Sequence, residues 1–106
     1  MKQEEPWIGF VHVQPRGRQN PLGDCIKGAF THVIALAAGR EAFIQMAYRA
    51  LEEADLRVVE INDVASVADY RVTGRISEEM EALVSSLSSA FPVQFDIFDT
   101  YRELDA

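Results

Sequence analysis

The alternation of apolar and polar residues divides the chain into strands and helices. A nearly continuous apolar run, Ala29–Ala37, predicts a strand near the centre of a sheet. Apolar residues then recur at helical spacing over Arg40–Ala54, which predicts an amphipathic helix. Asp55 is expected to end this helix in the left-handed conformation that Asp tolerates better than most residues. The next strand is predicted at Leu56–Ile61.

The second half of the chain carries the same kinds of signal, more weakly. Val67–Val72 is interpreted as a further extended segment. Ser77 is expected to cap a second helix that runs to about Ala90, because glutamates fill its first turn and Pro92 follows its end. Val93–Phe98 alternates apolar and polar residues, as a strand with one wet face does.

Counted from Ala29, this order is the ferredoxin-like βαββαβ pattern, with two helices on one face of an antiparallel sheet. Trp7–Val13 is then an extra N-terminal strand at an edge of that sheet. If Val67–Val72 is not a strand, a four-stranded sheet uses the N-terminal strand instead. In both cases we expect an α+β protein with a two-layer sandwich.

A length of 106 residues predicts a single domain, 1–106, with loose polar tails at 1–6 and 99–106. The stretch 14–28 contains two of the 4 prolines and three of the 6 glycines, and is interpreted as a long loop. Long loops without their own structure are often functional, so this segment is a candidate surface for binding.

The chain is acidic, with 17 acidic and 10 basic side chains and a formal net charge of −7. This charge disfavours nucleic acid as a partner and is explained either by solubility or by an acidic face that meets a basic protein. No apolar run reaches the roughly 20 residues that cross a membrane, and the N-terminus lacks a signal-peptide pattern. With Cys25 as the single cysteine, we expect a cytoplasmic protein, and no motif suggests a cofactor.

Three residues are weak candidates for catalysis: Cys25 as a nucleophile, with His12 or His32 as its base. The two histidines lie on predicted strands that are able to pair, so their imidazoles are expected on one face. The same groups are potential metal ligands, but no pair has a short ligand spacing, and we predict no metal site.

Other residues suggest binding instead of chemistry. Arg16 and Arg18 are flanked by glycine and polar residues in the predicted loop, where a guanidinium is able to bind a carboxylate or phosphate through two hydrogen bonds. Trp7, Phe10 and Tyr70 are aromatic residues on predicted edge elements, which suggests an interface with a second copy.

The sequence EADLRVVEINDV after the first predicted helix, together with the element order, resembles small ligand-sensing modules of the ACT type over about 29–98. Such modules hold a ligand at a dimer interface, beside an Asp-x-Pro-Gly turn between the first strand and the first helix. The corresponding turn here runs from Ala37 to Arg40 and shares only its glycine, Gly39. The resemblance implies that Gly39 and Arg40 contact a ligand.

Three functional hypotheses follow. The first is a small non-enzymatic cytoplasmic binding or regulatory module that forms a homodimer. The second is an acidic inhibitor, of the immunity-protein kind, that neutralises a basic toxin or enzyme. The third is a small enzyme that uses Cys25 with a histidine.

Overall fold

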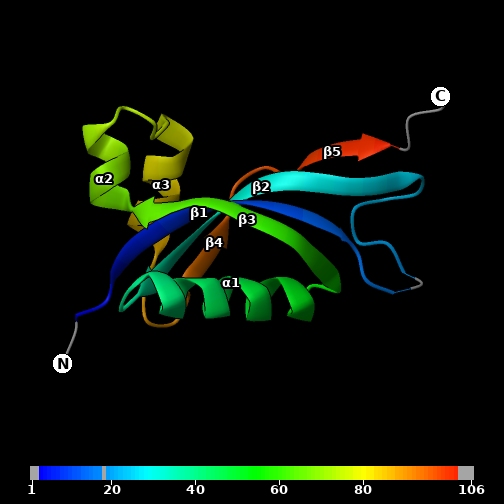
Figure 1. The fold of residues 1–106 in the computed structure, drawn as a ribbon, viewed down its shortest axis with the longest axis horizontal. Helices are drawn as coiled ribbons and strands as arrows, with labels where there is room; N and C mark the ends of the chain where they lie inside the picture. The colour runs from blue at the N-terminus through cyan, green and yellow to red at the C-terminus, as the bar shows by residue number, and fades with distance from the viewer. Residues whose placement is uncertain (1–2, 18, 103–106) are drawn as a thin grey trace.

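The computed structural model describes residues 3–17 and 19–102. Within these residues the chain forms one antiparallel sheet and three helices (Figure 1). The elements in chain order are β1 (Glu5–Pro15), β2 (Ile26–Ala37), α1 (Arg40–Glu53), β3 (Leu56–Ser66), α2 (Val67–Val72), α3 (Glu78–Ser86), β4 (Val93–Phe95) and β5 (Asp99–Arg102).

The sheet has the order β3-β1-β2-β4, and β5 also pairs with β2. All of these pairings are antiparallel. The α+β class is therefore confirmed, whereas the ferredoxin-like order is not. The prediction of Trp7–Val13 as an edge strand is wrong, because β1 lies between β2 and β3. Its apolar residues on both faces fit this central position, since a central strand is able to have packed layers above and below it.

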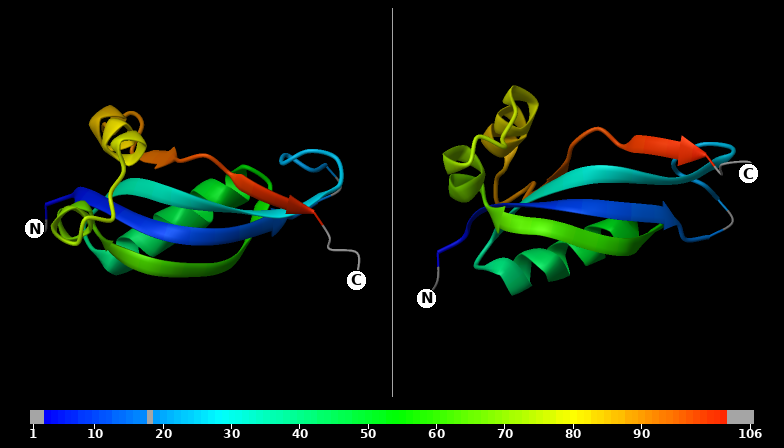
Figure 2. Two further views of the ribbon diagram at one scale, coloured as in Figure 1. Left: turned by 90° about the horizontal axis from the view of Figure 1, so that it is seen from above. Right: turned by 45° about the horizontal axis from the view of Figure 1, so that its top comes forward.

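The helices lie on opposite faces of the sheet, so the prediction of two helices on one face is also wrong (Figures 1 and 2). One face packs against α1, and one end of the other face packs against α2 and α3. The cause is visible in the strands: Val33 of β2 contributes to the core beneath α1, and its neighbour Ile34 contributes to the core beneath α2 and α3. Successive side chains of a strand point to opposite faces of the sheet. Two adjacent apolar residues are therefore both buried only if other elements pack on each face.

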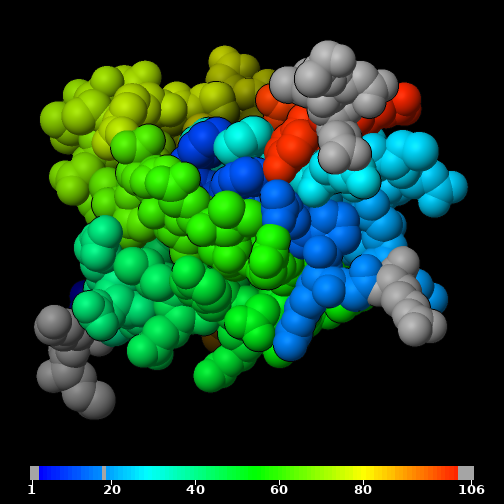
Figure 3. Space-filling model, turned by 45° about the vertical axis from the view of Figure 1, so that its right-hand side comes forward, coloured from blue at the N-terminus to red at the C-terminus, as the bar shows by residue number. Residues whose placement is uncertain are grey.

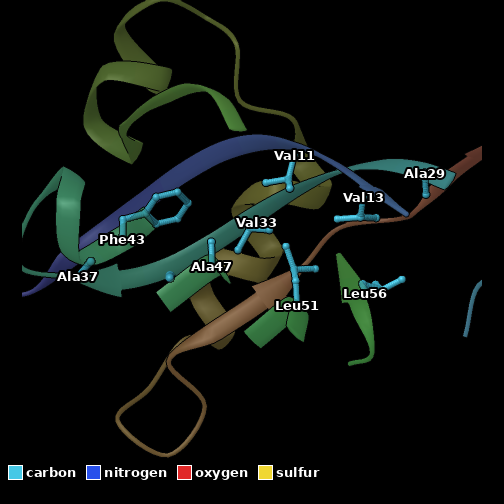
Figure 4. Packing of buried hydrophobic residues seen from close by; sticks show 10 residues of the cluster. Val11, Val13, Ala29, Val33, Ala37, Phe43, Ala47, Leu51 and Leu56 are labelled. Atoms are coloured by element: carbon cyan, nitrogen blue, oxygen red, sulfur yellow. The ribbon is translucent and has the colours of Figure 1, made fainter. Parts of the chain in front are cut away.

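The larger core lies between α1 and the sheet (Figure 4). Phe43, Ala47 and Leu51 occupy one stripe of α1, and all three are completely buried. They pack against strand residues that include Val11 and Val33, which are also completely buried. This packing confirms the helix that the apolar spacing predicted.

The smaller core contains Ile8, Ile34, Val67, Tyr70 and Met80. Its helix α2 corrects the prediction of an extended segment at Val67–Val72. Val67 and Tyr70 are three residues apart and face the sheet together, which is a helical spacing. Ser66 caps the helix, because its side chain accepts a hydrogen bond from the backbone N–H of Asp69 at 3.1 Å.

Other boundaries follow local signals. Asp55, which follows the C-cap Ala54 of α1, has a φ of 63°, the left-handed conformation that was expected there. The Ser77 side chain accepts a hydrogen bond from the Met80 N–H, which confirms it as the cap of α3. Residues 99–102 form β5 where a loose tail was expected, because they pair with the start of β2. The long loop is shorter than predicted, since β1 continues to Pro15 and β2 begins at Ile26.

Candidate functional site

The second face of the sheet carries aromatic and imidazole rings beyond the part that α2 and α3 cover. Side chains of β1 and β2 are visible on this face (Figure 3). They lie between β5 on one side and β3, α2 and α3 on the other. All of the rings are partly buried. We call this surface the aromatic face; it consists of Phe10, His12, Phe30, His32 and Tyr101.

Strand pairing sets the arrangement of the four rings on β1 and β2. Phe10 is opposite His32, and His12 is opposite Phe30, in the antiparallel register. The ring centroids of these pairs are 4.9 Å and 4.5 Å apart. The rings of Phe10 and Phe30 stack across the diagonal with centroids 5.7 Å apart and planes inclined by 9°. Such contacts between rings on neighbouring strands stabilise the sheet and hold each ring in place.

Tyr101 of β5 extends the aromatic face along β2. Its ring centroid is 5.5 Å from that of His12 and 5.8 Å from that of Phe30. Its hydroxyl oxygen is 2.6 Å from Nε2 of His12, so one of these two groups donates a hydrogen bond to the other. Gly28 makes room for this ring, because a Cβ at that position would overlap the Tyr101 hydroxyl.

A chain of polar groups continues from Tyr101 across the end of the sheet. Gln14 of β1 donates a hydrogen bond to the Tyr101 hydroxyl over 3.5 Å. Arg57 of β3 in turn donates to the side-chain oxygen of Gln14. These contacts place the guanidinium of Arg57 at the end of the aromatic face that is distant from α2.

Carboxylates border the aromatic face on two sides. Glu60 of β3 is the register partner of His12, and Asp99 of β5 is the register partner of Phe30; both are exposed. Directly opposed residues of paired strands direct their side chains to the same face. The carboxylates of Asp96 and Asp63 act electrostatically on His32. The rings therefore form an apolar centre with an acidic border.

Burial lowers the pKa of His32 below its usual value, although the carboxylates of Asp96 and Asp63 oppose this shift. The unfolded chain then binds more protons than the folded chain between this lowered pKa and about 6.5. We therefore expect the free energy of unfolding to fall as the pH falls through that window. The variant His32→Phe should lose less stability between about pH 7.5 and pH 5, measured by urea unfolding at each pH. An equal or larger loss of unfolding free energy in His32→Phe would contradict a contribution of His32 to the pH dependence of stability.

The structure places His12 and His32 on one face, as predicted, but surrounds each with rings. Cys25 is exposed at the end of the 16–25 loop with a φ of 67°. Within residues 3–17 and 19–102, no hydrogen bond or ring contact joins Cys25 to either histidine. In the same residues, no group of three or more His, Cys, Asp or Glu side chains is arranged to hold a metal ion.

Among the described residues, the predicted ligand-binding residues lie away from the aromatic face, with Arg16 near the C-terminal end of α1 and Gly39 and Arg40 at its N-terminal end. Arg16 forms an ion pair with Glu52 of α1 at 3.5 Å, and its backbone N–H donates to the carbonyl of Asp55. Gly39 and Arg40 lie at the start of α1. Arg18 lies outside the residues that the structure describes.

The three predicted interface residues have different surroundings. Phe10 belongs to the aromatic face. Trp7 packs against the larger core, and its indole N–H is buried with no hydrogen-bond partner among the described residues. Tyr70 is only 2% exposed and donates a hydrogen bond to the carbonyl of Asp63. The expectation that Tyr70 lies on an edge element is wrong, because helix α2 turns this side chain into the smaller core.

An apolar pocket of about 280 Å³ lies at the other side of the molecule, next to the end of α1. Its lining includes Leu22, Leu56, Phe95 and Phe98, all of which pack against the larger core. The pocket is therefore a continuation of that core, bordered by Pro21 and Leu22 of the segment before β2.

Sequence reasoning did not identify Phe30 and Tyr101 as parts of a site. Phe30 was included in a buried strand, and Tyr101 in a loose tail. Asp99–Arg102 contains one apolar residue, Tyr101, and therefore offers no periodic signal for β5; only pairing with β2 places Tyr101 beside His12.

Comparisons with protein-family models, curated proteins and solved structures found no match for this chain. Among the described residues, no helix is both long enough and apolar enough to cross a membrane. The aromatic face is therefore interpreted from its own geometry.

Proposed function

We propose that this protein is a small binding module, not an enzyme, and that it holds a macromolecular partner on the aromatic face. The observation that supports this function is a group of five rings from three strands, partly exposed on the sheet surface beside α2 and α3. Aromatic residues are enriched at the centres of protein interfaces, because they bury a large area with little loss of side-chain entropy.

The surroundings of the histidines favour binding over catalysis. His12 contacts the rings of Phe30 and Tyr101, and its Nε2 already has a partner in the Tyr101 hydroxyl. His32 packs against Phe10. These contacts make both imidazoles parts of one packed group of rings. The single cysteine is compatible with a cytoplasmic location, which we include in the proposal.

Site-specific photo-crosslinking in the native host tests this function. A benzophenone amino acid is placed at Asn62, an exposed position opposite Phe10 in the register of β1 and β3. The matched control carries the same amino acid at Gln45, an exposed position on α1, which packs on the other face of the sheet. We expect a discrete crosslinked species from Asn62 and only diffuse, weak labelling from Gln45.

A further variant distinguishes specific binding at the aromatic face from non-specific adhesion. Phe10→Ser, combined with the crosslinker at Asn62, should abolish the discrete species while the circular dichroism spectrum stays unchanged. Equal labelling at Asn62 and Gln45, or labelling that persists in Phe10→Ser, would contradict the proposed function. A species that proves to be two copies of this chain would agree with it.

Self-association through the edge of β3 is a second candidate. Among the described residues, β3 pairs with β1 alone, so its 11 residues have one edge without a strand. Such an edge is able to pair with the same edge of a second copy. The pairing of β1 with β3 has two register irregularities, and these also disturb the free edge of β3. The free edge therefore offers a shorter length for regular pairing.

A further inference from the structure

The acidic border of the aromatic face limits the kind of partner that the face is able to hold. Glu60 lies beside His12 on the β3 side, and Asp99 lies beside Phe30 on the β5 side. Asp96 and Asp63 add negative charge near His32. Arg57 of β3 places one positive charge at the far end, where it donates a hydrogen bond to the neutral side chain of Gln14. An occupant of this face therefore meets rings at its centre, carboxylates on its two sides and one cation at the far end.

We infer that the partner is a basic protein, which lays a segment of mixed apolar and Arg or Lys side chains across the aromatic face. This inference rests on the proposed function and adds the chemistry of the partner. The apolar side chains of the segment cover the rings of Phe10 and Phe30. Its cationic groups pair with Glu60 and Asp99 on the two sides. An apolar centre with a charged margin is the common arrangement of a protein interface.

Charge complementarity favours this occupant over the alternatives. Two copies of this chain meeting face to face would bring the carboxylates of one aromatic face against those of the other, and each copy carries a formal charge of −7. Nucleic acid and acidic proteins would be repelled by the same groups. A basic segment is attracted at long range and then covers the rings.

The test uses two synthetic peptides as probes, one of alternating arginine and tryptophan and one of alternating glutamate and tryptophan. Each is titrated into the ¹⁵N-labelled protein at low ionic strength and followed by NMR. The basic peptide should shift the amide signals of β1 and β2 at residues 10, 12, 30 and 32, and added salt should reverse these shifts. The acidic peptide should leave them unchanged.

Charge reversal then locates the binding site. The double variant Glu60→Lys, Asp99→Lys should bind the basic peptide about tenfold more weakly, because two attractive margins become repulsive. The control is Glu41→Lys, Glu53→Lys, which makes the same change in net charge at exposed positions of α1. This control should weaken binding by about twofold or less, since its charges lie on the other face.

Equal weakening in the two double variants would overturn the inference, because only overall acidity would then attract the peptide. Binding of the acidic peptide, or concentration-dependent shifts on the aromatic face without any peptide, would also overturn it. The crosslinking experiment distinguishes failure of this inference from failure of the proposed function. A crosslinked partner without a basic segment contradicts this inference and leaves the proposed function standing, whereas the absence of a face-specific species contradicts both.

Discussion

Phe43→Ala is expected to lower the free energy of unfolding by about 3–5 kcal/mol. Phe43 is completely buried, and its ring lies directly against Gly9 of the central strand β1. Removing the ring leaves a cavity between α1 and the sheet, and the rigid strands beneath are poorly able to fill it. A domain of this size has a total stability of about 5–15 kcal/mol, so this single change removes a large part of it.

Urea unfolding followed by circular dichroism and by the fluorescence of Trp7 measures this effect. Trp7 packs against the same core and therefore reports on its integrity. Tyr48→Ala is the matched control, because it removes an aromatic ring from the same helix at a position that is 41% exposed. The control should cost about 1 kcal/mol or less. Similar losses in the two variants would show that α1 does not pack on the sheet through Phe43.

Local sequence signals predicted the parts of the fold that depend on neighbouring residues. The predicted helix at Arg40–Ala54 corresponds to α1, and Asp55 and Ser77 end and begin helices as their side chains suggested. These features follow from helical periodicity and from hydrogen bonds over three or four residues. These local signals can be read from the sequence because they do not depend on where the helix packs in the fold.

Features that depend on distant pairing were not predictable in the same way. Val67–Val72 has six residues, which is too short for strand and helix periods to differ clearly, and packing on Ile34 selects the helix. The position of β1 between β2 and β3 depends on pairings with strands that come much later in the chain. The candidate site shows the same limit. A shared face for His12 and His32 was expected, but Tyr101, 89 residues from His12, was not.

The two cores lie on opposite faces of the sheet, so substitutions at adjacent residues of β2 are expected to destabilise different helices. Ile34 faces α2 and α3 and Val33 faces α1, and both are completely buried. Ile34→Ala is expected to cost about 2–5 kcal/mol. Much of this loss should be local, because the smaller core packs α2 and α3 against the sheet. Local opening should therefore require less free energy than global unfolding.

Amide hydrogen exchange separates local from global loss of stability. In Ile34→Ala, protection should fall most in α2 and α3, at residues 67–72 and 78–86, while α1 keeps more of its protection. Val33→Ala, the matched control one residue earlier, should reverse this order and affect α1 and the strands that it covers. If both variants lowered protection equally in all three helices, the two cores would unfold as one cooperative unit. The helices that flank the aromatic face would then open only together with the sheet.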